Sequence, residues 1–95
     1  MRVWYTPRAL ADREEIFSYL DQRNQRAARD VIGVIKRQID GLADQPHKGR
    51  PTDRGGIYTL WARPYPYRIY YRIDQHEVVI LHIRHTSRRP WPGIS

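Results

Sequence analysis

An imidazole and two guanidinium groups near the ends of predicted strands are the side chains of this sequence best suited to chemistry. Arg63 lies at the end of one predicted strand, His85 ends the last one, and Arg88 follows it. Arginine neutralises phosphate, and histidine titrates close enough to neutral pH to move a proton. Taken singly, His85 reads as a structural histidine and the arginines as surface charges. Their joint position makes them candidates for a site.

Strand alternation gives a second set of candidates. Between residues 67 and 73, aromatic and β-branched side chains alternate with polar ones, which is typical of a half-buried strand. If this strand pairs with the last strand in simple register, one exposed face carries Arg68, Tyr70, Arg72, His82 and Arg84. The preceding loop adds the cations Lys48, Arg50 and Arg54. Because arginines contact phosphates and tyrosine rings stack on bases, we predict a surface that binds nucleic acid or another target.

Metal and cofactor chemistry are disfavoured by the residue types available. The sequence has no cysteine. His82 and His85 are three residues apart on a strand and would therefore point to opposite faces. Carboxylates do not cluster near the last strands, and no glycine-rich phosphate loop precedes a helix. We therefore predict no metal site and no cofactor.

The composition is that of one small, basic, folded domain spanning residues 1–95. Of these 95 residues 40% are hydrophobic, three are tryptophan, and the formal net charge is +7. Such a chain can build a packed core, and its arginine-rich surface favours a polyanionic partner, either nucleic acid or an acidic protein. No secretory signal and no apolar run of membrane-spanning length is present, so we expect a cytoplasmic protein without a membrane partner.

The first half of the chain predicts a short strand and two antiparallel helices. Arg2–Tyr5 reads as the strand. A helix over about 7–22 follows, with Thr6 as its cap, and a second helix covers about 25–43. The expected apolar stripe of the first helix is Leu10, Ile16, Phe17 and Leu20. The expected stripe of the second helix is Ala28, Val31, Ile32, Ile35, Ile39 and Leu42.

The second half predicts a three-stranded antiparallel meander. Asp44–Gly56 reads as a loop, either a mobile basic flap or a plain connector. Strands follow over 57–63, 67–73 and 77–85. Alternation assigns the core side of the last strand to Val79, Leu81 and Ile83. The predicted fold class is α+β, in which the first strand, the helix hairpin and the meander share one mostly antiparallel sheet.

The order of these elements, together with several short motifs, resembles the RelE/ParE superfamily of type II toxin-antitoxin toxins. The motifs are Gly49-Arg50-Pro51, Ile57-Tyr58 through Arg63, Tyr67 through Arg72, and Val78 through Arg89. Each motif alone is loose, but their order and spacing extend over nearly the whole chain. The resemblance implies a small toxin that inhibits bacterial growth and is neutralised by a cognate antitoxin wrapped around it.

The resemblance implies two alternative targets. RelE-like members cleave messenger RNA on the ribosome, whereas ParE-like members inhibit DNA gyrase without a reaction of their own. Under the RelE reading, Arg63 and Arg88 match family arginines and would stabilise the transition state, while His85 would act as acid or base. The ParE reading is supported because the paired loop lysines and the tail tyrosine of RelE-like members have no counterpart in this sequence.

A third alternative is a basic nucleic-acid-binding module that is not a toxin. It would bind generic RNA or DNA with a steep salt dependence. In either toxin reading, the charge of +7 predicts an antitoxin whose toxin-binding segment is acidic and folds as it docks.

Overall fold

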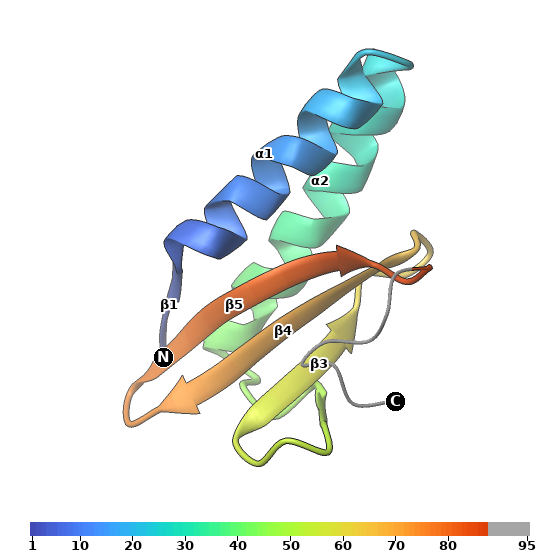
Figure 1. Cartoon of the computed structure of the whole chain (residues 1–95). Coiled ribbons are helices and arrows are strands. Elements are labelled where there is room, and N and C mark those ends of the chain that lie inside the picture. Colours follow the sequence, from blue (N-terminus) through green and yellow to red (C-terminus); the bar gives the residue numbers. More distant parts are fainter. Residues whose placement is uncertain (88–95) are drawn as a thin grey trace.

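The computed structural model describes residues 1–87, which form two long helices and a five-stranded sheet (Figure 1). The helices are α1 (Pro7–Asp21) and α2 (Gln25–Asp40), and the short 3-10 turn η1 (Gly41–Ala43) follows them. The strands are β1 (Arg2–Tyr5), β2 (Arg50–Pro51), β3 (Ile57–Trp61), β4 (Tyr67–Asp74) and β5 (Glu77–His85). The predicted first strand, helix hairpin and α+β class are confirmed.

Side-chain caps fix where both helices begin. The Thr6 hydroxyl accepts a hydrogen bond from the Ala9 amide at 3.1 Å, which confirms its role as a cap. The Asn24 side chain accepts from the Ala27 amide at 3.0 Å and starts α2 after a tight connection. α2 ends at Asp40, earlier than predicted, because the chain tightens there into η1.

The core-facing side of α1 differs from its predicted apolar stripe. Leu10 and Phe17 are 44% and 39% exposed, so their assignment to the core was wrong. The side chains that α1 turns inward are Ala9, Asp12, Ile16 and Leu20. The apolar pattern misled because this helix buries a small residue and a hydrogen-bonded carboxylate on its inner side.

The predicted stripe of α2 is confirmed, and it supplies the larger apolar surface. Its buried members, including the one in η1, are Ala28, Val31, Ile35, Ile39 and Leu42, with Ile32 partly buried beside them. The helix-facing side of β4 and β5 completes the core with Tyr67, Ile69, Tyr71, Val78, Ile80 and Ile83. The core therefore lies between the helix pair and one face of the sheet, as the ribbon shows (Figure 1).

The strand order is β1-β5-β4-β3-β2. β3, β4 and β5 form the predicted antiparallel meander, and β1 pairs in parallel with β5, from Arg2 opposite Glu77 to Tyr5 opposite Ile80. The loop prediction missed β2, which pairs antiparallel with β3 through two residues only. Such a short strand containing a proline carries almost no alternation signal, which explains the omission.

A β-bulge in β5 reverses the expected side-chain alternation. Tyr70 lies opposite His82, but the next residue, Tyr71, lies opposite Ile80, so Leu81 is the extra residue. Upstream of the bulge the core side consists of Val78 and Ile80 rather than Val79 and Leu81, and downstream it contains Ile83. Assigning Val79 and Leu81 to the core side was therefore wrong, because strict alternation fails at a bulge.

Tyr71 fastens the basic loop to the sheet. Its hydroxyl donates to the Pro46 carbonyl at 2.8 Å and accepts from the Gly49 amide at 3.0 Å. Its ring stacks on Tyr58, with centroids 5.4 Å apart. A Cβ on Gly49 would lie 2.6 Å from the Tyr71 hydroxyl, so only glycine fits at this approach. These contacts make this part of the loop a fastened connector rather than a flap.

Stability should fall in alkaline solution because two tyrosines are buried and a third is partly buried. Burial raises the pKa of Tyr5, Tyr67 and Tyr71 above the ordinary value of 10.0. The unfolded chain therefore loses phenolic protons first, and the stability these groups provide is present below about pH 10 and is lost as pH rises through their folded-state pKa values.

We expect the free energy of unfolding, measured with urea, to decline above about pH 10. The decline should be less steep in Tyr71→Phe, because this variant has one fewer buried phenol. Tyr19→Phe is the matched control, since Tyr19 is 56% exposed. A Tyr71→Phe variant with the same alkaline slope as the parent chain would contradict this expectation.

Candidate functional site

The face of the sheet opposite the core, here called the outer face, carries the predicted target-binding side chains. By register it holds Arg50, Thr59, Trp61, Arg68, Tyr70, Arg72, His82 and Arg84. Arg68 lies opposite Arg84 and Tyr70 opposite His82, which confirms the predicted shared face. The expectation that this whole face is exposed was wrong, because Tyr70 and His82 are 5% and 6% exposed.

Trp61 gathers two arginines at one corner of the outer face. The guanidinium carbons of Arg63 and Arg68 lie 4.0 and 4.8 Å from the centroid of its ring. The indole nitrogen donates to the Tyr65 carbonyl at 2.9 Å, which fixes the ring. Cation–π contact holds the guanidinium groups in place. The arrangement suits an anionic or carboxylate-bearing partner.

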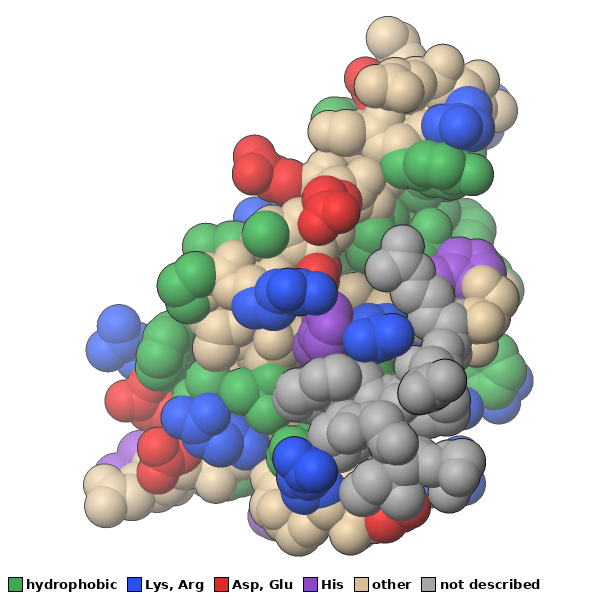
Figure 2. Space-filling view, viewed as in Figure 1, with side chains coloured by type: hydrophobic (Ala, Val, Ile, Leu, Met, Phe, Trp, Pro, Cys, Tyr) green, Lys and Arg blue, Asp and Glu red, His purple; other side chains and the backbone are tan. Residues whose placement is uncertain are grey.

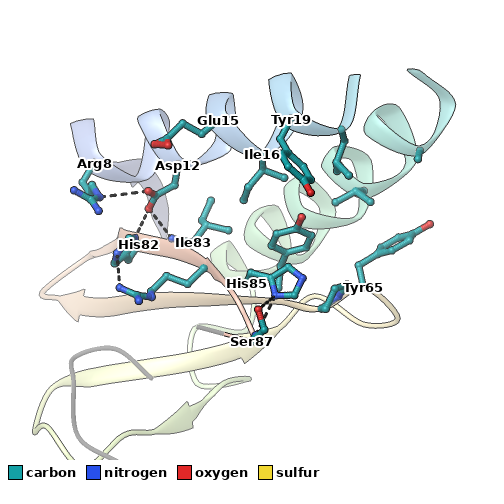
Figure 3. Close-up of a pocket in the computed structure, with 16 residues that line it drawn as sticks. Arg8, Asp12, Glu15, Ile16, Tyr19, Tyr65, His82, Ile83, His85 and Ser87 are labelled. Atoms are coloured by element: carbon teal, nitrogen blue, oxygen red, sulfur yellow. Dashed lines mark hydrogen bonds and ion pairs between the residues drawn. The ribbon is translucent and has the colours of Figure 1, made fainter. Parts of the chain in front are cut away.

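A buried hydrogen-bonded network links α1 to the outer face (Figure 3). The carboxylate of Asp12 contacts the His82 imidazole and accepts from the Ile83 amide at 2.9 Å, and its other oxygen pairs with Arg8 at 3.3 Å. On the far side of the imidazole, an Arg84 nitrogen lies 3.3 Å from Nε2. Asp12 is 7% exposed. Sequence reasoning missed Asp12 because a single acidic residue in an early helical turn reads as a favourable dipole contact.

The side chain of His85 is on the opposite face of the sheet from Arg68 and Arg84, although Arg84 lines the same groove as His85. It pairs with Tyr67, whose ring it meets edge-on at 5.2 Å, and both residues face the helices. Its Nδ1 accepts from the Ser87 amide at 3.0 Å and from the Ser87 hydroxyl at 2.7 Å. Its Nδ1 is therefore an acceptor and its proton is on Nε2 in the neutral ring. The expected gathering of His85 with the outer-face cations was wrong, because His85 alternates with Ile83 and pairs with Tyr67, and both of these residues are on the helix side of the sheet.

His85 instead lines an open groove of about 740 Å³ between α1, the start of α2, the start of β4 and the end of β5. Its walls include Ile16, Tyr19, Leu20, Val31, Tyr65 and Tyr67 (Figure 3). No sequence pattern indicates this groove, since its walls come from α1, α2, β4 and β5, which are far apart in the sequence.

The remaining predicted residues do not share one face of the sheet. Lys48 lies 3.5 Å from the Gln38 side chain, and Arg72 lies 3.9 Å from Asp74. Arg50 is in β2, and Arg54 is in the turn before β3. Arg88 is outside the described residues. Figure 2 shows basic side chains over both the sheet and the helices, with acidic side chains along the helices and at the lower part of the sheet.

Within residues 1–87, no group of three histidine or carboxylate side chains is placed to hold a metal ion. Over the same residues, both helices are too short and too polar to cross a membrane.

Comparison with known proteins identifies close relatives over almost the whole chain. Residues 3–90 match the family described as ParE toxin of type II toxin-antitoxin system, parDE. Protein Y4kP of Sinorhizobium fredii is 34% identical over 98% of this chain and 95% of its own. Toxin RelE2 of Caulobacter vibrioides is 36% identical over 92% of this chain and 97% of its own. The chromosomal ParDE toxin-antitoxin system from P. aeruginosa contains a similar structure, with a TM-score of 0.79, 25% identity, and coverage of 90% and 95% of the two chains.

Proposed function

Because this chain belongs to the ParE toxin family of type II toxin-antitoxin systems, we propose that it inhibits bacterial growth by binding DNA gyrase and not by cleaving RNA. It is the toxin component of such a system, and its partner is a cognate antitoxin. Family membership sets aside the alternative of a non-toxic nucleic-acid-binding module. The proposed site of action is the bacterial cytoplasm, where gyrase works.

The position of His85 is the observation that carries this proposal. Metal-independent cleavage of RNA needs an acid or base within hydrogen-bond reach of the reacting phosphate, next to the cations that stabilise its charge. His85 faces the helices, whereas Arg63 and Arg68 stack on Trp61 on the outer face. In addition, Nδ1 of His85 already accepts two hydrogen bonds from Ser87. This separation supports a binding protein over a nuclease.

The outer face has the composition of a protein-binding surface. Arginine and aromatic side chains are enriched at protein interfaces, and several arginines pairing with carboxylates would speed association. Trp61, Arg63, Arg68 and Arg84 supply this combination. Gyrase is the proposed occupant of this face, and the cognate antitoxin, if its binding segment is acidic, would compete for it.

A supercoiling assay with purified gyrase tests the proposal. The purified chain should inhibit supercoiling of relaxed plasmid in a dose-dependent way, and antitoxin added beforehand should relieve the inhibition. In parallel, translating ribosomes with a defined messenger RNA should yield intact transcripts at the same toxin concentrations. Cleaved transcripts together with normal supercoiling would replace the proposal with ribosome-dependent RNA cleavage.

His85→Ala should leave gyrase inhibition and toxicity in place, because the residue is on the helix side and has no role in the proposed interface. His85→Asn is the conservative companion, since it keeps a polar group beside Ser87. Growth after induction and plasmid supercoiling are the measurements. Loss of toxicity in both variants, with antitoxin binding and thermal stability retained, would instead indicate His85 as an acid or base.

A further inference from the structure

We propose that Asp12 and His82 are positioning residues that hold Arg84 so that it and Arg68 can receive a carboxylate of the protein target. The inference deepens the proposed function, since it assumes that the outer face binds the target. It assigns a role to two polar residues that are too deeply buried to contact the target protein themselves.

Hydrogen-bond chemistry fixes the direction of this network. The Arg84 guanidinium has only donors, so His82 Nε2, 3.3 Å from an Arg84 nitrogen, must be the acceptor. The His82 proton is therefore on Nδ1, where it is donated to the Asp12 carboxylate. The two contacts thus require one tautomer of neutral His82, and Asp12 is the group that selects it.

The backbone holds Asp12 in place for this task. β1 covers the edge of β5 only as far as Ile80, so the Ile83 amide beyond it has no strand neighbour at that edge. The same Asp12 oxygen that contacts His82 accepts from this amide at 2.9 Å. Arg8 pairs with the other oxygen and is largely exposed, so it contributes less to the orientation.

The network holds Arg84, which forms a pair of cations with Arg68 on the neighbouring strand. Arg68 lies directly opposite Arg84 and is held on its own side by Trp61, 4.8 Å from its guanidinium carbon. Two arginines fixed apart in this way can grip one carboxylate between them. Arg84 Nε is buried, so a carboxylate of the target would have to meet the terminal nitrogens of this guanidinium. We prefer a carboxylate to a nucleic acid base because a base would need a free aromatic ring to stack on, and the Trp61 ring is already in contact with two arginines.

The first test is the tautomer of His82 in the purified chain, which requires no gyrase. Long-range nitrogen–proton NMR should show the proton on Nδ1 in the parent chain. Asp12→Asn should keep the His82 proton on Nδ1, because the amide oxygen can still accept from both His82 and Ile83. Arg8→Gln is the matched control, since it removes only the contact to the other oxygen. A proton on Nε2 in the parent chain would overturn the proposal.

The second test is a double-mutant cycle on gyrase inhibition. His82→Leu removes the ring but leaves Asp12 bonded to Ile83 and Arg8, and it should weaken inhibition roughly tenfold, as Arg84→Gln should, because each removes a charge-assisted contact. The double variant should be no weaker than Arg84→Gln alone, since His82 acts through Arg84. The proposal would be overturned if the effects of the two substitutions multiplied in the double variant. It would also be overturned if His82→Leu inhibited gyrase as well as the parent chain does. Absence of inhibition by the parent chain would contradict the gyrase assignment and not the tautomer.

Discussion

Replacing Tyr71 by alanine should cost about 4 kcal/mol of unfolding free energy or more, because the ring is fully buried in the core. The substitution also removes the hydroxyl that joins Pro46 and Gly49 to the sheet. A domain of this size is stable by only about 5–15 kcal/mol, so the variant should be close to unfolded at 37 °C.

Tyr71→Phe separates the hydroxyl from the ring. It keeps the stacking on Tyr58 but leaves a backbone amide and a carbonyl without their partner, so it should cost about 2 kcal/mol. Gly49→Ala should be destabilising as well, since its Cβ would meet the same hydroxyl. Urea unfolding followed by circular dichroism measures all three. A Tyr71→Phe variant as stable as the parent would show that the hydroxyl does not fasten the loop.

Reversing the two arginines on Trp61 should remove most gyrase inhibition. In Arg63→Glu/Arg68→Glu, a pair of cations becomes a pair of anions opposite the proposed carboxylates, which should weaken inhibition at least about a hundredfold through like-charge repulsion. Arg26→Glu/Arg29→Glu changes the net charge by the same amount on the exposed side of α2 and is the matched control.

The measurements for this pair are the supercoiling assay and the salt dependence of antitoxin binding. The control variant should inhibit gyrase as the parent chain does, whereas Arg63→Glu/Arg68→Glu should not. Equal loss in both variants would indicate that net charge alone, rather than the outer face, governs the interaction.

The helices and the meander were predictable because their patterns are long and repetitive. α2 buries its apolar stripe as its spacing indicates, and Thr6 caps α1 as its residue type indicates. The errors lie where one residue departs from the pattern. Leu81 is an extra residue in β5, and Asp12 occupies a position on α1 that apolar periodicity would give to a hydrophobic residue.

The candidate site was predictable in its residue types but not in its geometry. Alternation placed Arg68 and Arg84 on one face, and register confirms it. The helix-side orientation of His85 follows from its alternation with Ile83, whereas its contacts with the Tyr67 ring and with Ser87 are not encoded by a periodic pattern. Long-range contacts such as Asp12 to His82, 70 positions apart, also lie beyond sequence patterns.

The most direct test of the account follows translation and plasmid supercoiling in the same culture during the first minutes after the toxin is induced. The account predicts that supercoiling fails while protein synthesis initially continues, and that transcripts remain intact. Early loss of protein synthesis with truncated transcripts, before any change in supercoiling, would contradict it.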